Sequence, residues 1–169
     1  MIKLGEMQEL EVAKVVDFGV YLISSDDEKA EDRILLPIKQ VPENINIGDK
    51  INVFVYRDSS DRIIATVKRP KIAIGEIAYL KVVEIARIGA FMNWGLEKDL
   101  FLPFKEQVDE IKINGDYLVG IYIDKSDRLC ATMNLFNVLR TDSPYKVNDM
   151  VTGTVFSLKR GLGAMVAVE

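Results

Sequence analysis

The chain has 169 residues, of which 49% are hydrophobic and 28% are charged, and its formal net charge is −4. This composition is typical of a globular protein with a hydrophobic core and argues against a disordered chain. The acidic balance excludes a surface coated with positive charge, so affinity gained from phosphate neutralisation alone is expected to be modest.

The sequence contains one cysteine, Cys130, and no histidine. A single cysteine forms no intramolecular disulfide, which fits the reducing cytoplasm, and we expect a cytoplasmic protein. The start of the chain lacks the apolar core of a signal peptide, and no segment approaches the roughly 20 apolar residues of a membrane span. Without histidine, a phosphate-binding glycine loop or a nucleophile elbow, we expect no enzyme activity, no cofactor and no metal site.

One sequence pattern occurs twice along the chain, in five ordered blocks with matching intervals. The blocks pair 5–6 with 75–76, 15–22 with 85–92, 34–37 with 100–103, 47–49 with 113–116, and 56–66 with 122–132. A third copy of the opening begins at 147–149 and continues at 163–166. Two strands do not close a barrel and an isolated hairpin is marginal in water, so we expect a truncated third unit.

Each unit is predicted to be β. Residues 20–23 and 51–56 are rich in β-branched and aromatic residues and are bounded by turn residues. Residues 58–61 and 124–127 have the composition of hairpin loops. Five strands in a unit of this length indicate an all-β fold of small five-stranded barrels of OB type, whose closure removes exposed strand edges.

The repeat also sets the expected domain limits. Helical turns are predicted around 104–108 and within 135–140, and Pro70 ends the strand ladder of the first unit. The predicted organisation is a first barrel at 1–68, a linker at 69–74, a second barrel at 75–134, a linker at 135–145, and the start of a third barrel at 146–169.

Three strings carry a resemblance to known families. Residues 17–22 (DFGVYL) resemble the signature of the S1 RNA-binding domain, a glycine flanked by aromatic residues. Residues 56–63 (YRDSSDRI) resemble the closing pattern of that domain, with an Asp and an Arg four positions apart. Residues 93–104 (NWGLEKDLFLPF) resemble the second domain of the conserved virulence factor B family, and this resemblance covers essentially the whole chain. It implies several S1-like domains, a C-terminal winged helix and regulatory binding of RNA.

The sequence departs from the S1 pattern at several positions. Pro37 and Pro103 stand where a histidine often follows the third strand, and Ile88 occupies the place of Phe18 in the second unit. A serine near the end of the fifth strand is replaced in each unit, by Thr66 and Thr132. These departures predict weaker RNA binding, most of all by the second unit.

Strand alternation predicts which side chains face outward. With Val20 and Leu22 in the core, Tyr21 faces out, and Ala90 and Met92 in the core leave Phe91 outward. In the same way, inward Ile63 and Ala65 leave Arg62 outward, and inward Leu129 leaves Arg128 outward. The resemblance places these side chains on the binding face, where rings stack on bases and guanidinium groups meet phosphates. The expected RNA-binding residues are Phe18, Tyr21, Arg62, Lys68, Arg69, Phe91 and Arg128.

Structural alternatives stand beside these assignments. The rings of Tyr21 and Phe91 either bind bases, pack between domains or plug a barrel end. Arg62 and Arg128 bind phosphate, pair with Asp58 and Asp124, or do both. The basic run at 68–71 is either a phosphate path or a solvated linker. Tyr56 and Tyr122 are expected to be structural, Trp94 to pack against its own barrel, and Cys130 to be a plain strand residue.

The function that the sequence favours is binding of single-stranded RNA with modest affinity and weak sequence preference. The alternative is a protein-interaction module that uses the same exposed rings. An acidic loop at 26–32 is expected to be solvated and to repel RNA locally.

Overall fold

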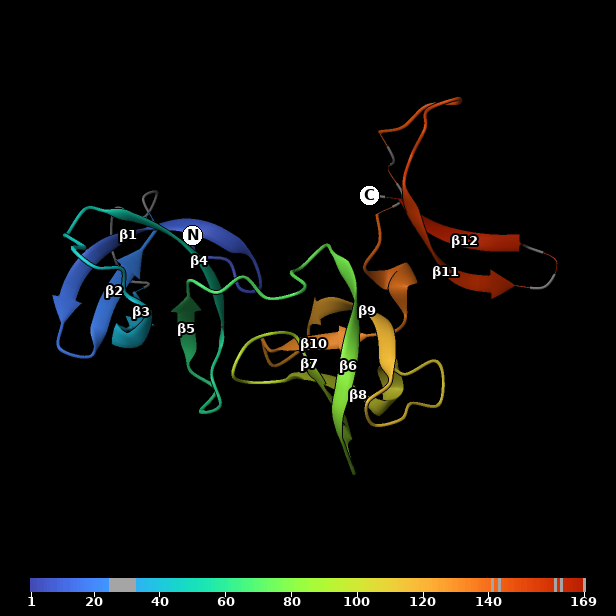
Figure 1. Cartoon of the computed structure of the whole chain (residues 1–169), viewed down its shortest axis with the longest axis horizontal. Coiled ribbons are helices and arrows are strands. Elements are labelled where there is room, and N and C mark those ends of the chain that lie inside the picture. Colours follow the sequence, from blue (N-terminus) through green and yellow to red (C-terminus); the bar gives the residue numbers. More distant parts are fainter. Residues whose placement is uncertain (25–32, 141, 143, 160, 162, 169) are drawn as a thin grey trace.

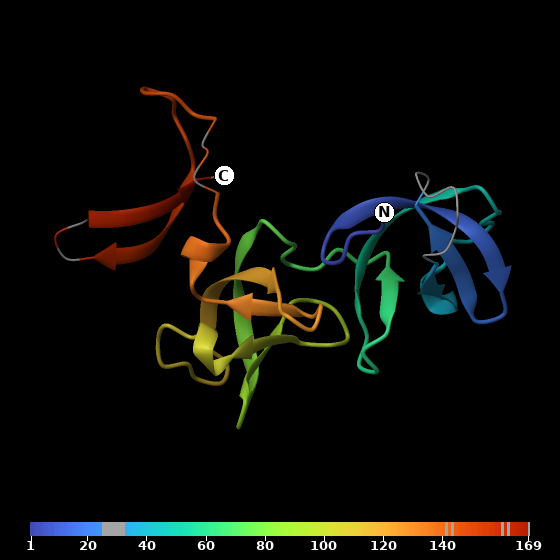
Figure 2. The ribbon, with the colours of Figure 1, turned by 180° about the vertical axis from the view of Figure 1, so that it is seen from behind.

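The alternating runs of the sequence form short strands that close into two five-stranded barrels, followed by a two-stranded sheet, in a computed structural model of the protein (Figure 1). The structure describes residues 1–24, 33–140, 142, 144–159, 161 and 163–168, so the predicted acidic loop at 26–32 lies outside the described residues. Figures 1 and 2 show the three units following one another along the long axis of the molecule. The prediction of an all-β fold with two tandem five-stranded barrels is confirmed, and the described residues that follow them form a small two-stranded sheet.

The first barrel has the strand order β1-β2-β3-β5-β4, and β4 closes onto β1. All its pairs are antiparallel except β3 with β5, which run parallel. A short 3₁₀ turn, η1, follows β3, and the sequence reasoning missed it. The elements are β1 (Met7–Val16), β2 (Gly19–Ile23), β3 (Ile34–Pro37), η1 (Ile38–Gln40), β4 (Lys50–Arg57) and β5 (Ile63–Thr66).

The second barrel repeats this topology, with β10 pairing parallel to β8 and β9 closing onto β6. The predicted helical turns occur as the 3₁₀ turns η2 and η3. The elements are β6 (Ile77–Ala86), β7 (Gly89–Asn93), β8 (Leu100–Pro103), η2 (Phe104–Glu106), β9 (Asp116–Ile123), β10 (Leu129–Thr132) and η3 (Leu135–Asn137).

The first strand of every unit carries a β-bulge at the same place. The register shifts between Val12 and Lys14 in β1 and between Val82 and Glu84 in β6. The sheet of β11 (Gly153–Lys159) and β12 (Gly163–Val168) has the same shift between residues 155 and 157. A bulge increases the local twist, which lets one long strand bend around a small barrel and pair with both of its neighbours. Within the described part of the chain, no helix has the length and apolar character needed to cross a membrane.

Alternation along β2 and β7 fills the barrel interiors as predicted. Val20, Leu22, Ala90 and Met92 are fully buried. The prediction that Ile63 points into the core is wrong, because its side chain is 44% exposed. Ile63 is the first residue of β5 and belongs to the last pair of the β4–β5 ladder, so it lies at the rim of the barrel beyond the core.

The two barrels share a hydrophobic core at their junction. Trp94, only 2% exposed, packs edge-on against two rings of the first barrel, with centroid distances of 5.7 Å to Phe54 and 6.3 Å to Tyr56. The indole N–H donates to the carbonyl of Lys98, 2.5 Å away. Trp94 therefore packs against its own barrel, as predicted, and it also packs against the first barrel, which was not predicted. Local sequence could not predict the contact with the first barrel, because its two rings lie about 40 positions earlier in the chain.

The predicted linker also belongs to this shared core. Ile72 is fully buried within it, and Pro70 is buried as well. The backbone N–H of Lys71 donates to the carbonyl of Trp94 (2.8 Å), and that of Ile74 donates to the carbonyl of Gly5 (3.0 Å). The connection is thus packed against both barrels through Pro70 and Ile72, while the three cations of the basic run, Lys68, Arg69 and Lys71, are exposed to solvent.

Candidate nucleic-acid interface

The first barrel presents a pair of aromatic rings on its outer surface. Gly19 opens β2 with a positive φ, and this turn from β1 holds Phe18 outside the barrel, 56% exposed. Tyr21 lies on the outward side of β2, half-buried, opposite Leu35 of β3. The two rings meet edge to face with their centroids 6.3 Å apart. The structure therefore brings these two predicted residues together as one platform.

The second barrel presents a different pair. Ile88 takes the place of Phe18, and Phe91 instead contacts Phe101 of β8, with ring centroids 5.3 Å apart. Phe101 lies directly opposite Phe91 in the β7–β8 register. Sequence reasoning missed Phe101 as a site residue, although a signal was present: Leu100 and Leu102 are both buried, so strand alternation leaves the residue between them outside.

An arginine follows each fourth strand and is held by an aspartate of the hairpin turn. Arg62 donates from Nε and Nη2 to the Asp58 carboxylate, at 2.9 and 2.7 Å. Arg128 makes the same pair of bonds to Asp124, at 3.2 and 3.1 Å. The predicted structural pairing is present in both barrels. Both guanidinium groups also remain exposed to solvent. Each keeps N–H donors that the ion pair does not use, and these can bind a further ligand.

Each turn aspartate is held in its charged form. Burial opposes the charge of Asp58, but hydrogen bonds from the Arg62 backbone, the Arg62 guanidinium and the Ser60 backbone outweigh it and lower its pKa. Burial likewise opposes the charge of Asp124, and hydrogen bonds from the backbones of Ser126 and Arg128 and from the Arg128 guanidinium lower its pKa. The two turns are thus equivalent in structure and in electrostatics.

The two predicted linker cations lie beside the first barrel. Lys68 follows β5 and is exposed, and its backbone N–H donates to the Thr66 hydroxyl. Arg69 is exposed and forms an ion pair with Glu76 at 3.0 Å. Neither side chain lines the pocket described next, so the structure does not bring these cations together with Phe91 or Arg128.

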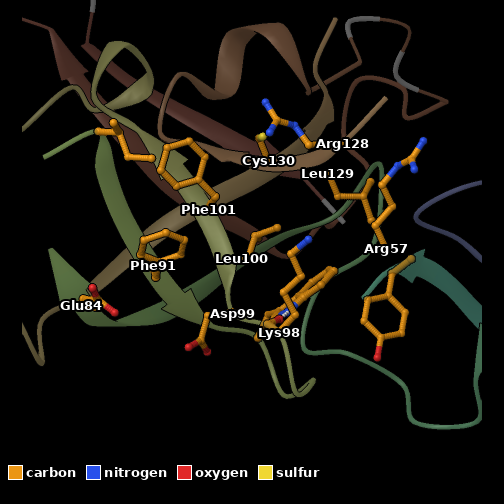
Figure 3. A pocket seen from close by; sticks show the side chains of 13 residues that line it. Arg57, Glu84, Phe91, Lys98, Asp99, Leu100, Phe101, Arg128, Leu129 and Cys130 are labelled. Atoms are coloured by element: carbon orange, nitrogen blue, oxygen red, sulfur yellow. Dashed lines mark hydrogen bonds between the residues drawn. The ribbon is translucent and has the colours of Figure 1, made fainter. Parts of the chain in front are cut away.

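A pocket of about 440 Å³ opens where the two barrels meet (Figure 3). This volume lies within the usual range of ligand pockets, about 300–1,000 Å³. Its apolar wall contains Phe91 and Phe101, and Arg57 reaches it from β4 of the first barrel. Figure 3 shows the two carboxylates, Glu84 and Asp99, on the opposite side of the pocket from the guanidinium groups. The lining residues are Tyr56, Arg57, Glu84, Ile88, Phe91, Trp94, Lys98, Asp99, Leu100, Phe101, Arg128, Leu129 and Cys130.

Other titratable groups near the pocket are structural. Burial raises the pKa of the Cys130 thiol to about 11, so this cysteine of β10 is a protonated strand residue at neutral pH. Burial, with Cys130 and Glu106 nearby, raises the pKa of Tyr122 to about 12. Among the described residues, no group of three acidic, cysteine or histidine side chains is placed to hold a metal ion.

The strand order, the one parallel pair in each closed barrel and the outward rings define a protein of tandem OB-type barrels. The S1 domain family model matches residues 4–68 and 74–134, so the chain belongs to the S1 domain family.

Relatives agree with this assignment. The chain is 32% identical over 165 residues to the uncharacterized protein YitL of Bacillus subtilis, covering 91% of this chain and 53% of that one. It is 25% identical to conserved virulence factor B of Staphylococcus epidermidis, covering 93% of this chain and 55% of the relative, which confirms the resemblance seen in the sequence. The chain thus spans about half the length of the curated relatives it matches.

A solved structure has the same fold. It is a crystal structure described as a multidomain protein with nucleic acid binding domains from Streptococcus pneumoniae TIGR4. The TM-score is 0.65 at 16% identity, and the match covers 98% of this chain and 59% of the other.

Proposed function

We propose that this chain binds single-stranded RNA through its S1-type barrels, by stacking bases on exposed rings and contacting phosphates with nearby cations. The observation that carries the proposal is that each barrel has both an outward aromatic pair and an arginine-bearing hairpin turn. Base–aromatic stacking contributes about 1–3 kcal/mol per base and tolerates any sequence. Weak sequence preference follows from this mode of binding.

The residues divide into two roles. Phe18 and Tyr21 form the stacking platform of the first barrel, and Phe91 with Phe101 forms that of the second. Arg62, Arg128, Lys68 and Arg69 supply positive charge near the backbone of the RNA. The net charge of −4 limits non-specific attraction, so we expect modest affinity that depends on the rings.

The proposal includes the organisation of the chain. Residues 1–68 and 75–134 act as binding modules, and residues 146–169 are the start of a third S1-like unit. The last assignment is supported by the bulge that β11 shares with β1 and β6. The proposal also includes a regulatory role in the cytoplasm, the reducing compartment that a chain with a single cysteine fits.

Fluorescence polarisation with a labelled single-stranded RNA tests the proposal. Tyr21→Ala and Phe91→Ala should each weaken binding by about 1–3 kcal/mol, because each removes one stacking surface. Tyr79→Ala is the matched control, since Tyr79 is a 60% exposed ring on β6 that belongs to neither platform. Unchanged affinity in Tyr21→Ala, Phe91→Ala and Arg62→Ala together would refute the site.

A salt titration separates RNA binding from the rival, an apolar protein interface. Binding of RNA through phosphate contacts weakens steeply as salt rises, because condensed counterions are released on binding. An interface that depends on the exposed rings alone would barely respond to salt. A flat salt dependence would therefore favour the protein-interaction module.

A further inference from the structure

The pocket at the junction contains side chains from both barrels, and two of them, Arg57 and Trp94, align in the repeat with residues of a different kind. Arg57 ends β4 of the first barrel, and the repeat aligns it with Ile123 of the second. Trp94, which forms the wall between the barrels, aligns with Ser24. The pocket is therefore a product of the pairing of two units and does not occur within either unit alone.

Arg57 joins the hairpin turns of the two barrels. Its Nε donates to the carbonyl of Asp127 in the second barrel (2.7 Å), and its Nη1 donates to the carbonyl of Asp61 in the first (2.8 Å). Among the described residues, no carboxylate lies within 4.0 Å of this guanidinium, whereas Arg62 and Arg128 are both paired with aspartates. Two bonds to backbone carbonyls fix the Arg57 guanidinium in place without a carboxylate beside it, and its Nη2 remains available as a donor.

Two further cations stand at the same junction. Lys98 donates from Nζ to the carbonyl of Asp58 in the first barrel (2.9 Å) and lies 3.9 Å from the Asp61 carboxylate. Arg128 lines the pocket from β9–β10. Figure 3 shows Phe91 and Phe101 side by side, with Arg57 and Arg128 on one side of these rings. The two rings are tilted by 41° relative to each other, so each offers its own flat face beside the cations. An aromatic face next to fixed cations matches the two parts of a nucleotide, the base and the phosphate.

We propose that the two barrels together form one nucleotide-binding site for single-stranded RNA, with the base on Phe91 and Phe101 and the phosphate held by Arg57 of the first barrel. This rests on the proposed function and deepens it, because it makes the pair of barrels the binding unit. Arg57 Nη2 donates a hydrogen bond to the phosphate, and Arg128 and Lys98 add positive potential.

The acidic wall gives this site a direction. Glu84 and Asp99 both line this side of the pocket; burial raises the pKa of Asp99, and the nearby Glu84 raises it further. A phosphate placed there would be repelled, whereas a base amino group can donate to a carboxylate. The sugar–phosphate backbone is thus directed toward Arg57, and the base edge toward Glu84 and Asp99.

Polarisation titrations at several salt concentrations test the role of Arg57. Arg57→Gln should bind a labelled single-stranded RNA about tenfold more weakly, the usual cost of losing a hydrogen bond to a charged group. It should also reduce the slope of log affinity against log salt by about 0.7, the value for one phosphate contact on a single strand.

Two variants serve as controls for this titration. Arg57→Lys keeps the charge and should keep the slope. Lys50→Gln, at the opposite end of β4 and paired with Glu9, removes the same charge and should match the wild type.

Trp94 is the one tryptophan of the chain and lines this pocket, so its fluorescence reports occupancy and the integrity of the junction. RNA should change its emission in the wild type. A loss of affinity in Arg57→Gln with an unchanged salt slope would overturn the phosphate contact, because Arg57 would then act only by joining the two turns. If Arg57→Gln binds RNA as tightly as the wild type while Phe91→Ala binds it more weakly, the composite site is overturned and the proposed function stands. A wild type that binds no RNA would overturn both.

Discussion

At the scale of single residues, two glycines set the position of the aromatic platforms. Gly19 and Gly89 have φ values of 153° and 154°, and each lies where β2 or β7 begins. A Cβ on Gly19 would lie 2.2 Å from the carbonyl oxygen of Leu36, and one on Gly89 would lie 2.4 Å from that of Leu102. Only glycine lets these neighbouring strands approach so closely.

Gly19→Ala should therefore destabilise the first barrel. The new methyl group meets backbone that cannot move aside without breaking the β2–β3 ladder, and we expect a loss of about 3 kcal/mol in the free energy of unfolding. The measurement is urea denaturation followed by circular dichroism. Gly48→Ala is the control: Gly48 has φ 92° with nothing within 4 Å of its Cβ position, so only about 1 kcal/mol of backbone strain is expected. Equal losses in the two variants would contradict the steric argument.

Some residues of the candidate site follow from local sequence and others do not. Tyr21 and Phe91 were predictable because strand alternation needs only neighbouring residues, and both lie on the outer side of their strands. The contribution of Arg57 required knowledge of which turn of the second barrel lies beside β4, a contact between residues 70 positions apart. No pattern within either repeat contains that information.

At the scale of elements, the hairpin turns of β4–β5 and β9–β10 are stabilised by local hydrogen bonds and by an aspartate in a left-handed backbone conformation. Asp61 and Asp127 adopt left-handed φ values of 62° and 53°, which the short polar side chain of aspartate tolerates. Asp58 accepts hydrogen bonds from the backbone N–H groups of Ser60 and Arg62, at 2.9 Å each. The composition of 58–61 was sufficient to predict a turn, because these interactions are local.

The turn carboxylates should make stability depend on acid. The pKa of Asp58 is lower in the folded chain than its ordinary value of about 3.9. The stability that its carboxylate contributes is therefore complete above that value and is lost as the pH falls through the folded-state pKa. Asp58→Asn should cost about 1 kcal/mol at pH 7, a small figure because the Arg62 partner is exposed to solvent.

Urea denaturation at pH 7 and at pH 3 checks this expectation. The difference in the free energy of unfolding between the wild type and Asp58→Asn should become smaller at the lower pH, where the wild-type carboxyl takes up its proton. Asp109→Asn, an exposed acid between η2 and β9, provides the control for a general change of charge. A difference that stays constant between the two pH values would show that the turn does not depend on the charge of Asp58.

At the scale of the whole molecule, the two barrels are not independent, although the repeat alone predicts two equal units. The outer surface of β4 carries Phe54, which packs on Trp94, and the repeat aligns Phe54 with Gly120 of β9. A Cβ on Gly120 would lie 2.5 Å from Val138, so the segment after β10 occupies this place in the second barrel. The fold of each unit was predictable from its own sequence, whereas the joining of the units depends on the positions where the two copies differ.

Trp94→Ala tests whether this junction makes the two barrels one folding unit. Removal of a buried tryptophan typically costs about 3–5 kcal/mol, and here the loss falls on contacts with Phe54 and Tyr56 of the other barrel. Calorimetry should therefore show one cooperative transition in the wild type and two separate transitions in the variant. Trp94→Phe keeps a ring in the same place and should largely preserve the single transition. Phe104→Ala removes an exposed ring of η2 and should change neither the number of transitions nor the midpoint temperature. If Trp94→Ala lowers the midpoint but keeps a single transition, the barrels are coupled through the buried linker at Ile72 more strongly than through the indole, because that segment packs into the same core.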